Sequence, residues 1–173
     1  MLPRVRLFSD PALRQKAKPY VFPDVHNIIE REELETFIDV MFQVMKNENG
    51  MGLAANQIGD PRAIFVLGGS IPEGVFINPE ILEQSDEIDF EEGCLSIPGA
   101  SGMTKRFNKV KLKYFTKEGT EVVEDFEGKT AIAIQHEMDH LEGKLYIDAF
   151  GHMKKTLILD KHRKFLKMFS RRK

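Results

Sequence analysis

Residues 135–143 form a segment whose residue types and spacing could bind a metal; it reads Gln-His-Glu-Met-Asp-His-Leu-Glu-Gly. His136 and His140 are four positions apart, and on a helix this spacing places them on one face, roughly 5–6 Å apart at Cβ. One divalent metal can then bind a nitrogen from each ring. Glu137 directly follows the first histidine, where its carboxylate can reach a water that the metal activates. This H-E-x-x-H pattern is typical of metal-assisted hydrolysis of carbonyl compounds.

A surface helix with two solvated histidines would show the same spacing without any metal. Apolar residues precede and interleave the polar ones, and they favour a helix packed on a core: Ile132, Ala133, Ile134, Met138 and Leu141. The segment itself contains no third protein ligand, so a metal site requires one from elsewhere in the chain.

Three kinds of residue could supply the third ligand to the histidine pair. A third histidine in the pattern H-E-x-x-H-x-x-G-x-x-H is excluded, because Tyr146 occupies its position. A carboxylate on a later helix is the second, and since no glutamate follows Glu142, only Asp160 on a predicted helix could serve. The third is the thiolate of Cys94, which with two imidazoles leaves a fourth position for water. A lone cysteine is more often a buried structural thiol, but Cys94 lies in a polar turn.

The composition is that of one globular domain of 173 residues, with 42% hydrophobic and 30% charged residues and a net charge of −2. The single cysteine excludes an internal disulfide. No apolar run is long enough to span a membrane, and no signal or transit segment is evident, so we expect a cytoplasmic protein without a membrane partner. Residues 153–173 contain nine Lys or Arg and one acidic residue, so a basic tail follows an acidic body.

The elements expected around the histidine segment alternate between helical and extended patterns. Helices are predicted at residues 10–14, 25–47 and from 129 onward, and a last one follows residue 151. Strands are predicted at residues 62–67, 75–82, 109–115 and 120–126, with an exposed strand or turn at 84–89. These elements predict an α+β fold, with mainly antiparallel sheet packed around a central metal-binding H-E-x-x-H helix and a C-terminal helix. We expect residues 1–150 to form the catalytic part, and the basic helix 151–173 to belong to the same domain.

Three segments resemble the signature motifs of the peptide deformylases, in the order and at the spacing of that family. They are Gly50–Gln57 (Gly-Met-Gly-Leu-Ala-Ala-Asn-Gln), Glu92–Ser96 (Glu-Gly-Cys-Leu-Ser) and the histidine segment Gln135–Gly143. The resemblance covers most of residues 4–150, and the members that the chain resembles are the bacterial type 1 members. It implies a metal-dependent hydrolase that removes the N-formyl group from the formylmethionine of newly made polypeptides and releases formate.

The resemblance also implies roles for individual residues. Cys94, His136 and His140 would bind one divalent metal, Fe²⁺ in the first instance, with Zn²⁺, Ni²⁺ or Co²⁺ as substitutes. Glu137 would be the general acid and base, and Gln57 with the backbone N–H of Leu95 would stabilise the oxyanion. The residues that would bind the substrate line an apolar slot and its rim: Met51, Gly52, Phe90, Glu92, Gly93, Ile132 and Ala133.

Two departures from the family pattern stand out. Many bacterial members carry an arginine shortly after the cysteine motif, where this chain has Gly99-Ala100-Ser101-Gly102. Lys129 stands where relatives often have an apolar residue at the rim of the slot. Glu92, Arg106 and Asp139 are further expected to form a charge cluster that orients the metal ligands, or else an ordinary surface network.

The basic C-terminal helix resembles the tail of type 1 members, which docks on the ribosome. Its candidate phosphate contacts are Lys154, Lys155, Lys161, Arg163, Lys164, Arg171, Arg172 and Lys173, although a solvated helix face explains the same residues. Two other functions compete with the deformylase interpretation. One is a metalloprotease-like peptidase with Asp160 as ligand, and the other is a non-catalytic relative that binds peptides or the ribosome.

Overall fold

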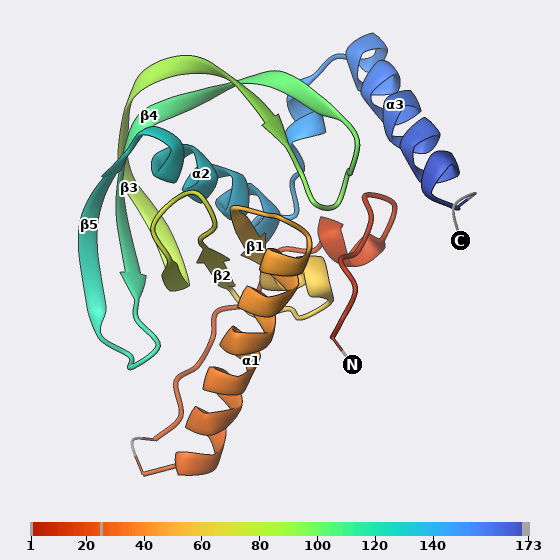
Figure 1. Ribbon diagram of the computed structural model, residues 1–173. Coiled ribbons are helices and arrows are strands. Elements are labelled where there is room, and N and C mark those ends of the chain that lie inside the picture. Colours follow the sequence, from red (N-terminus) through yellow and green to blue (C-terminus); the bar gives the residue numbers. More distant parts are fainter. Residues whose placement is uncertain (1, 25, 171–173) are drawn as a thin grey trace.

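The computed structural model describes residues 2–24 and 26–170, which form one antiparallel sheet and three α-helices (Figure 1). The strands lie side by side in chain order: β1 (Gly52–Ala54), β2 (Ile64–Leu67), β3 (Gly74–Gly93), β4 (Ser101–Phe115) and β5 (Glu121–Glu127). The helices are α1 (Ile28–Asn47), α2 (Gly128–Leu141) and α3 (His152–Ser170), with the short 3-10 helices η1 (Pro11–Arg14), η2 (Ala55–Ile58) and η3 (Tyr146–Ala149). The predicted α+β class is therefore confirmed.

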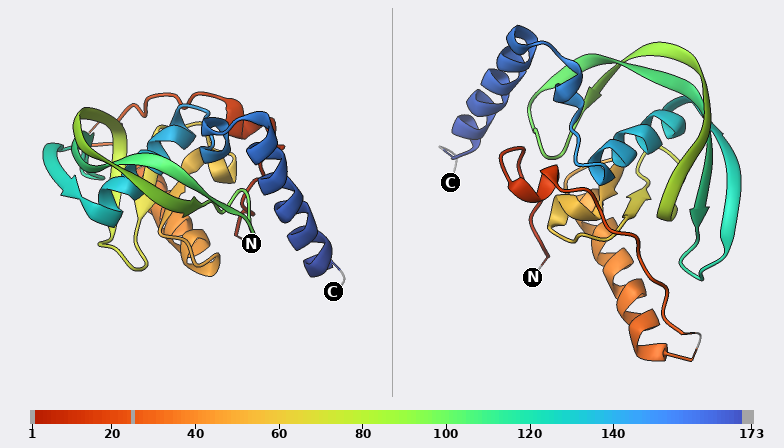
Figure 2. Two further views of the ribbon diagram at one scale, coloured as in Figure 1. Left: turned by 90° about the horizontal axis from the view of Figure 1, so that it is seen from above. Right: turned by 180° about the vertical axis from the view of Figure 1, so that it is seen from behind.

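Helix α2 carries the histidine segment and lies within the curve of the sheet, where it contacts β1, β2, β4 and β5 (Figures 1 and 2). Its apolar residues Ala131, Ile134 and Leu141 are buried against Phe65 of β2 and Phe76 of β3. Burial of this face explains why the polar positions of the segment lie in the protein interior rather than in solvent.

The sequence patterns of α1 and β4 predict their buried faces. In α1, Leu34, Ile38 and Met41 repeat at helical spacing, and all three are at most 3% exposed. In β4, Val110 and Leu112 are buried, while the alternating Lys111 and Lys113 pair with acidic residues of β3. Helix α1 begins at Ile28, after the N-cap Asn27, and the predicted start at residue 25 lies outside the described residues.

Strand β3 is much longer than the sequence patterns predict. It includes the expected strand 75–82 and the acidic stretch 84–89, and it continues to Gly93. Pairing with β4 provides the reason. Acidic residues of β3, such as Glu80 and Glu87, form ion pairs with lysines of β4, and these pairs stabilise the strand. The strand therefore ends directly before Cys94, which lies in the turn, as the sequence predicts.

Helix α3 contacts the body through a narrower strip than its apolar pattern predicts. Ile158 and His162 are buried, whereas Leu157, Met168 and Phe169 are each more than half exposed. One contact of the helix is with the segment after Cys94: His162 Nδ1 lies 2.9 Å from the carbonyl oxygen of Pro98. The basic residues 171–173 lie outside the described residues. No helix in residues 2–24 and 26–170 is long and apolar enough to cross a membrane.

Asp148 connects three parts of the chain that are distant in sequence. Its carboxylate accepts hydrogen bonds from Arg14 of η1, from Lys155 of α3 at 2.7 Å and from the backbone N–H of Leu145 at 2.9 Å. Burial acts to raise the pKa of Asp148, but these bonds outweigh it and lower the pKa to about 2. Since the folded pKa lies below the unfolded value of about 4, the ionised carboxylate stabilises the fold at neutral pH, and this contribution is lost as the pH falls toward 2.

Asp148→Asn is therefore expected to lower the free energy of unfolding by about 1 kcal/mol at pH 7, a value reduced for the partial exposure of the group. The difference from the wild-type protein should shrink as the pH falls from about 5 toward 2. Urea unfolding at several pH values measures both effects, with Asp125→Asn on the exposed edge strand as the control. A difference that does not change with pH would contradict the assignment.

Candidate metal centre and active site

The one cluster of potential metal ligands found in residues 2–24 and 26–170 consists of Cys94, His136 and His140. One ligand atom from each residue lies within 4.8 Å of the others, and Cys94 Sγ is 3.1 Å from His140 Nε2. The two histidines come from one face of α2, and the thiol comes from the turn after β3. Asp160 is not part of the cluster, and its carboxylate pairs with Arg163 instead. The structure thus brings the thiol of Cys94, and not the carboxylate of Asp160, next to the two histidines.

The chemistry of these donors fits a divalent cation. Two imidazoles and one thiolate are ligands that Zn²⁺ and Fe²⁺ both accept. His140 is 1% exposed, and its burial and the nearby charges of His136 and Arg106 lower its pKa, which keeps the ring in the neutral form that a metal ligand requires. For His136, burial acts to lower the pKa, but hydrogen bonds with Cys94 and Glu92 outweigh it and raise the pKa.

Glu137 lies beside the cluster as a buried carboxyl group. It is 3% exposed, and its Oε2 atom has no hydrogen-bond partner among the described residues. Burial raises the pKa of Glu137 to about 7, and the positive charge of His136 only partly opposes this effect. A carboxyl group near neutrality can both take and return a proton at physiological pH.

The expected charge cluster of Glu92, Arg106 and Asp139 is present and is bonded to His136, one of the potential metal ligands. Arg106 donates to both carboxylate oxygens of Glu92, at 3.0 and 3.1 Å, and to Asp139 at 2.7 Å. Glu92 Oε2 lies 2.8 Å from His136 Nδ1, so the other ring nitrogen is directed toward Cys94. Burial acts to raise the pKa of Glu92, but the bonds from His136 and Arg106 outweigh it and lower the pKa.

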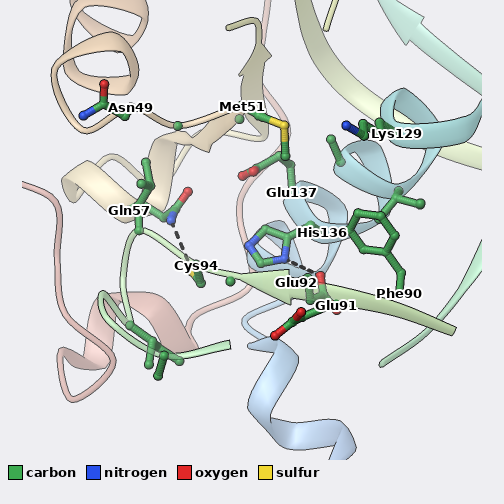
Figure 3. A pocket seen from close by; sticks show the side chains of 18 of the residues that line it. Asn49, Met51, Gln57, Phe90, Glu91, Glu92, Cys94, Lys129, His136 and Glu137 are labelled. Atoms are coloured by element: carbon green, nitrogen blue, oxygen red, sulfur yellow. Dashed lines mark hydrogen bonds and ion pairs between the residues drawn. The ribbon is translucent and has the colours of Figure 1, made fainter. Parts of the chain in front are cut away.

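Gln57 is held so that its amide donor faces the cluster. Its Oε1 accepts from the backbone N–H of Ala54 at 2.8 Å, and its Nε2 lies 3.2 Å from Ser96 Oγ and 3.8 Å from Cys94 Sγ. Leu95 follows Cys94 in the same turn and lines the same cavity. The arrangement therefore places an uncharged side-chain donor next to the potential metal ligands (Figure 3).

A cavity of about 360 Å³ opens beside these groups. Gln57, Cys94, Leu95, His136 and Glu137 line the cavity, whereas His140 does not. All predicted substrate-binding residues also line it: Met51, Gly52, Phe90, Glu92, Gly93, Ile132 and Ala133. The cavity lies between the start of β1 and the last residues of β3. In the described part of the chain, the last residues of β3 pair only with β4, since β2 pairs with Gly74–Ile77 at the other end of the strand. An extended peptide could therefore pair with the open side.

Gly52, the first residue of β1, shows why the motif that begins at Gly50 contains glycine. A Cβ atom at this position would lie 2.4 Å from Glu137 Oε1 and 2.9 Å from its Cδ, closer than any side chain tolerates. The backbone at Gly52 is therefore approached closely by the buried carboxyl group of Glu137, which a residue without a Cβ atom allows.

Several residues that support the site have no role in the sequence-based prediction. Ser96 is fully buried and contacts Gln57, and Thr104 donates to Glu92. Gln135 bonds both the N–H and the carbonyl of Phe107, which attaches α2 to β4. The sequence contains one weak signal for them, since Ser96 and Gln135 both fall within the quoted motifs.

The H-E-x-x-H helix, the three-residue ligand cluster and the buried glutamate define the chain as a metal-dependent hydrolase by class. The family model described as polypeptide deformylase matches residues 3–156. Peptide deformylase 1 of Clostridium perfringens is 44% identical over 146 residues, which cover 83% of this chain and 95% of the relative. A peptide deformylase of Phenylobacterium zucineum is 40% identical over 163 residues, covering 91% and 92%.

Solved structures agree with the sequence relatives. The crystal structure of a peptide deformylase from Legionella pneumophila has a TM-score of 0.90 at 35% identity and covers 99% of both chains. That of the peptide deformylase from Thermotoga maritima has a TM-score of 0.80 at 39% identity, covering 87% of this chain and 99% of its own. The chain belongs to the polypeptide deformylase family, whose metal-dependent enzymes remove the N-formyl group from newly made polypeptides.

Proposed function

We propose that Cys94, His136 and His140 hold the metal and that Glu137, Gln57 and Leu95 perform the deformylation. The observation that carries this assignment is the position of the buried Glu137 carboxyl beside the ligand cluster, at the wall of an open cavity. A divalent cation held by these ligands supplies Lewis acidity, which lowers the pKa of water and polarises a carbonyl.

The residues of the chain then have separate tasks. Glu137 takes a proton from the attacking water and returns it to the amine nitrogen as the bond between the formyl carbon and that nitrogen breaks. Gln57 Nε2 and the backbone N–H of Leu95 donate to the oxygen of the formyl group as it becomes negative, and one such donor is typically worth about 3–4 kcal/mol. Formate and the free α-amine of methionine are the products.

Substrate selection follows from the cavity walls. Phe90, Ile132 and Ala133 provide apolar surface for the methionine side chain. The backbone of Met51, Gly52 and Gly93 and the carboxylate of Glu92 form other parts of the cavity wall. The peptide adds as a strand to the open side of β3. We propose Fe²⁺ as the physiological metal, with Zn²⁺, Ni²⁺ and Co²⁺ as alternatives that the same donors accept.

The test compares two variants that separate the deformylase site from the protease alternative. Cys94→Ala is expected to lose stoichiometric metal and formate release from formyl-Met peptides, because one of three ligands is removed. Asp160→Ala should keep both, since its carboxylate lies outside the cluster and pairs with Arg163 on the surface. Metal content and formate are measured on anaerobically purified protein loaded with Fe²⁺ or Ni²⁺. Loss of metal in Asp160→Ala alone would contradict the assignment, and an inactive loaded wild-type protein would favour the non-catalytic alternative.

We also propose that residues 1–150 and α3 act as one domain, in the cytoplasm, with the basic face of α3 docking on the ribosome. Buried His162 and Ile158 support the first point, because they attach the helix to the body. For the second, the exposed Lys161 and Lys164 are suitable for RNA phosphates, whereas Lys155 and Arg163 already pair with acidic residues.

Charge removal tests this docking without truncating the fold. The double variant Lys161→Gln and Lys164→Gln is expected to weaken binding to purified ribosomes and to lower the salt dependence of binding by about two counterions. Lys109→Gln and Lys111→Gln, on the sheet, serve as the control pair. Unchanged affinity and salt dependence in the α3 variant would contradict the proposal.

A further inference from the structure

Lys129 is an exposed cation at the wall of the substrate cavity, and neither the fold nor the proposed chemistry requires it. It occupies the second position of α2, after the N-cap Glu127 and Gly128. A cation in the first turn of a helix opposes the helix dipole, so this position is not explained by helix stability. Among residues 2–24 and 26–170, no ion pair or hydrogen bond involves its ammonium group, although Glu127 is only two positions away.

The other charged groups that line the cavity are already paired or lie elsewhere. Glu92 is bound by Arg106 and His136, and Glu137 is buried at the bottom of the cavity. Glu91 is exposed and accepts a hydrogen bond from Ser101. In Figure 3, Lys129 lies on the side of Met51 and Phe90, whereas Glu91 points away on the opposite side. The first turn of α2 thus presents positive charge at one edge of the cavity.

The position of this charge relative to a substrate follows from the proposed function, on which the inference rests. An extended peptide points successive side chains to opposite faces, so the first and third residues share a face and lie about 7 Å apart. With methionine between Phe90, Ile132 and Ala133, the third side chain lies at the outer edge of the same slot. Lys129 is one helical turn before Ile132 and Ala133, toward solvent, which is within reach of that side chain.

We propose that Lys129 is a specificity-determining residue, which makes this enzyme favour formylated chains with an acidic third residue. The ammonium group pairs with the carboxylate of that residue at the rim, and a basic third residue is disfavoured by repulsion. Because the pair is exposed to solvent, the expected preference is modest, roughly two- to five-fold in kcat/KM.

The experiment measures kcat/KM for the C-terminally amidated peptides formyl-Met-Ala-Glu, formyl-Met-Ala-Gln and formyl-Met-Ala-Lys with metal-loaded enzyme. The wild-type order should be Glu, then Gln, then Lys, with about two- to five-fold between the first two. Lys129→Met, which keeps the apolar stem, should remove the difference, and Lys129→Glu should reverse the order. Lys144→Met, a lysine that does not line the cavity, should keep the wild-type order.

Each alternative outcome has a distinct meaning. Equal rates for the three peptides in the wild-type enzyme, or an unchanged ratio in Lys129→Met, would overturn the role of Lys129 while the deformylase assignment stands. A preference that appears with formyl-Met-Glu-Ala and not with formyl-Met-Ala-Glu would overturn the assigned position of the contact. If the loaded wild-type protein releases no formate from any of the peptides, the proposed function itself fails, and this inference fails with it.

Discussion

Glu137→Gln is expected to reduce kcat/KM for formyl-Met peptides by about 10²–10⁴-fold while the protein keeps one metal per chain. Glutamine has nearly the same shape and fills the same buried position, but it cannot take the proton from water. The three proposed metal ligands are unchanged, so metal content should stay at the wild-type value. Steady-state formate release and metal analysis of the same sample measure both quantities.

Glu142→Gln is the matched control, because Glu142 directly follows α2 and its side chain pairs with Lys16 at the surface. It should keep wild-type activity and metal. If Glu137→Gln loses the metal together with activity, Glu137 contributes to metal binding and its assignment as the proton carrier is wrong. If it keeps most of the activity, another group moves the proton.

Gly52→Ala should have the second-largest effect, although it adds only one methyl group. The new Cβ would lie 2.4 Å from Glu137 Oε1 and 3.0 Å from its Cγ, so the carboxyl group must move away from the cluster. A displacement of about 1 Å in a catalytic group can cost about 10²-fold in rate. We expect a loss of that size in kcat/KM, with metal content close to that of the wild-type protein.

The control for Gly52→Ala is Gly151→Ala, because a Cβ at Gly151 would meet no atom within 4 Å. It should leave activity and thermal stability unchanged. A Gly52→Ala enzyme with wild-type kcat/KM would show that the Glu137 carboxyl adapts without functional loss, and the position of that group would then be less constrained than the structure implies.

The sequence by itself determined the parts of the site that depend on local spacing. The four-residue separation of His136 and His140 gives one helical face in any helix, and the buried face of α2 follows from its apolar residues. The alternation at Val110 and Leu112 likewise predicts one buried face of β4. Residues that share one helix or strand need no knowledge of distant contacts.

Only the tertiary structure decided which distant residues meet these histidines. Cys94 and His140 are separated by 46 residues, and Gln57 and Cys94 by 37, so their contact depends on how β3 and η2 pack around α2. The chemistry of a thiolate made Cys94 a candidate, but Asp160 was an alternative until the fold placed it on the surface of α3. The register between β3 and β4 likewise brings Arg106 to Glu92, which no spacing within either strand could show.

The extent of β3 and the exposure of α3 were also decided by tertiary contacts. Cross-strand pairs with β4 extend β3 through an acidic stretch that has no hydrophobic pattern. Helix α3 contacts the body on the side of Ile158 and His162, near Pro98 and Phe8, and Met168 and Phe169 remain exposed despite their apolar character. The sequence therefore determined the reactive groups and their local faces, and the fold decided which of them share one cavity, because non-local packing sets those distances.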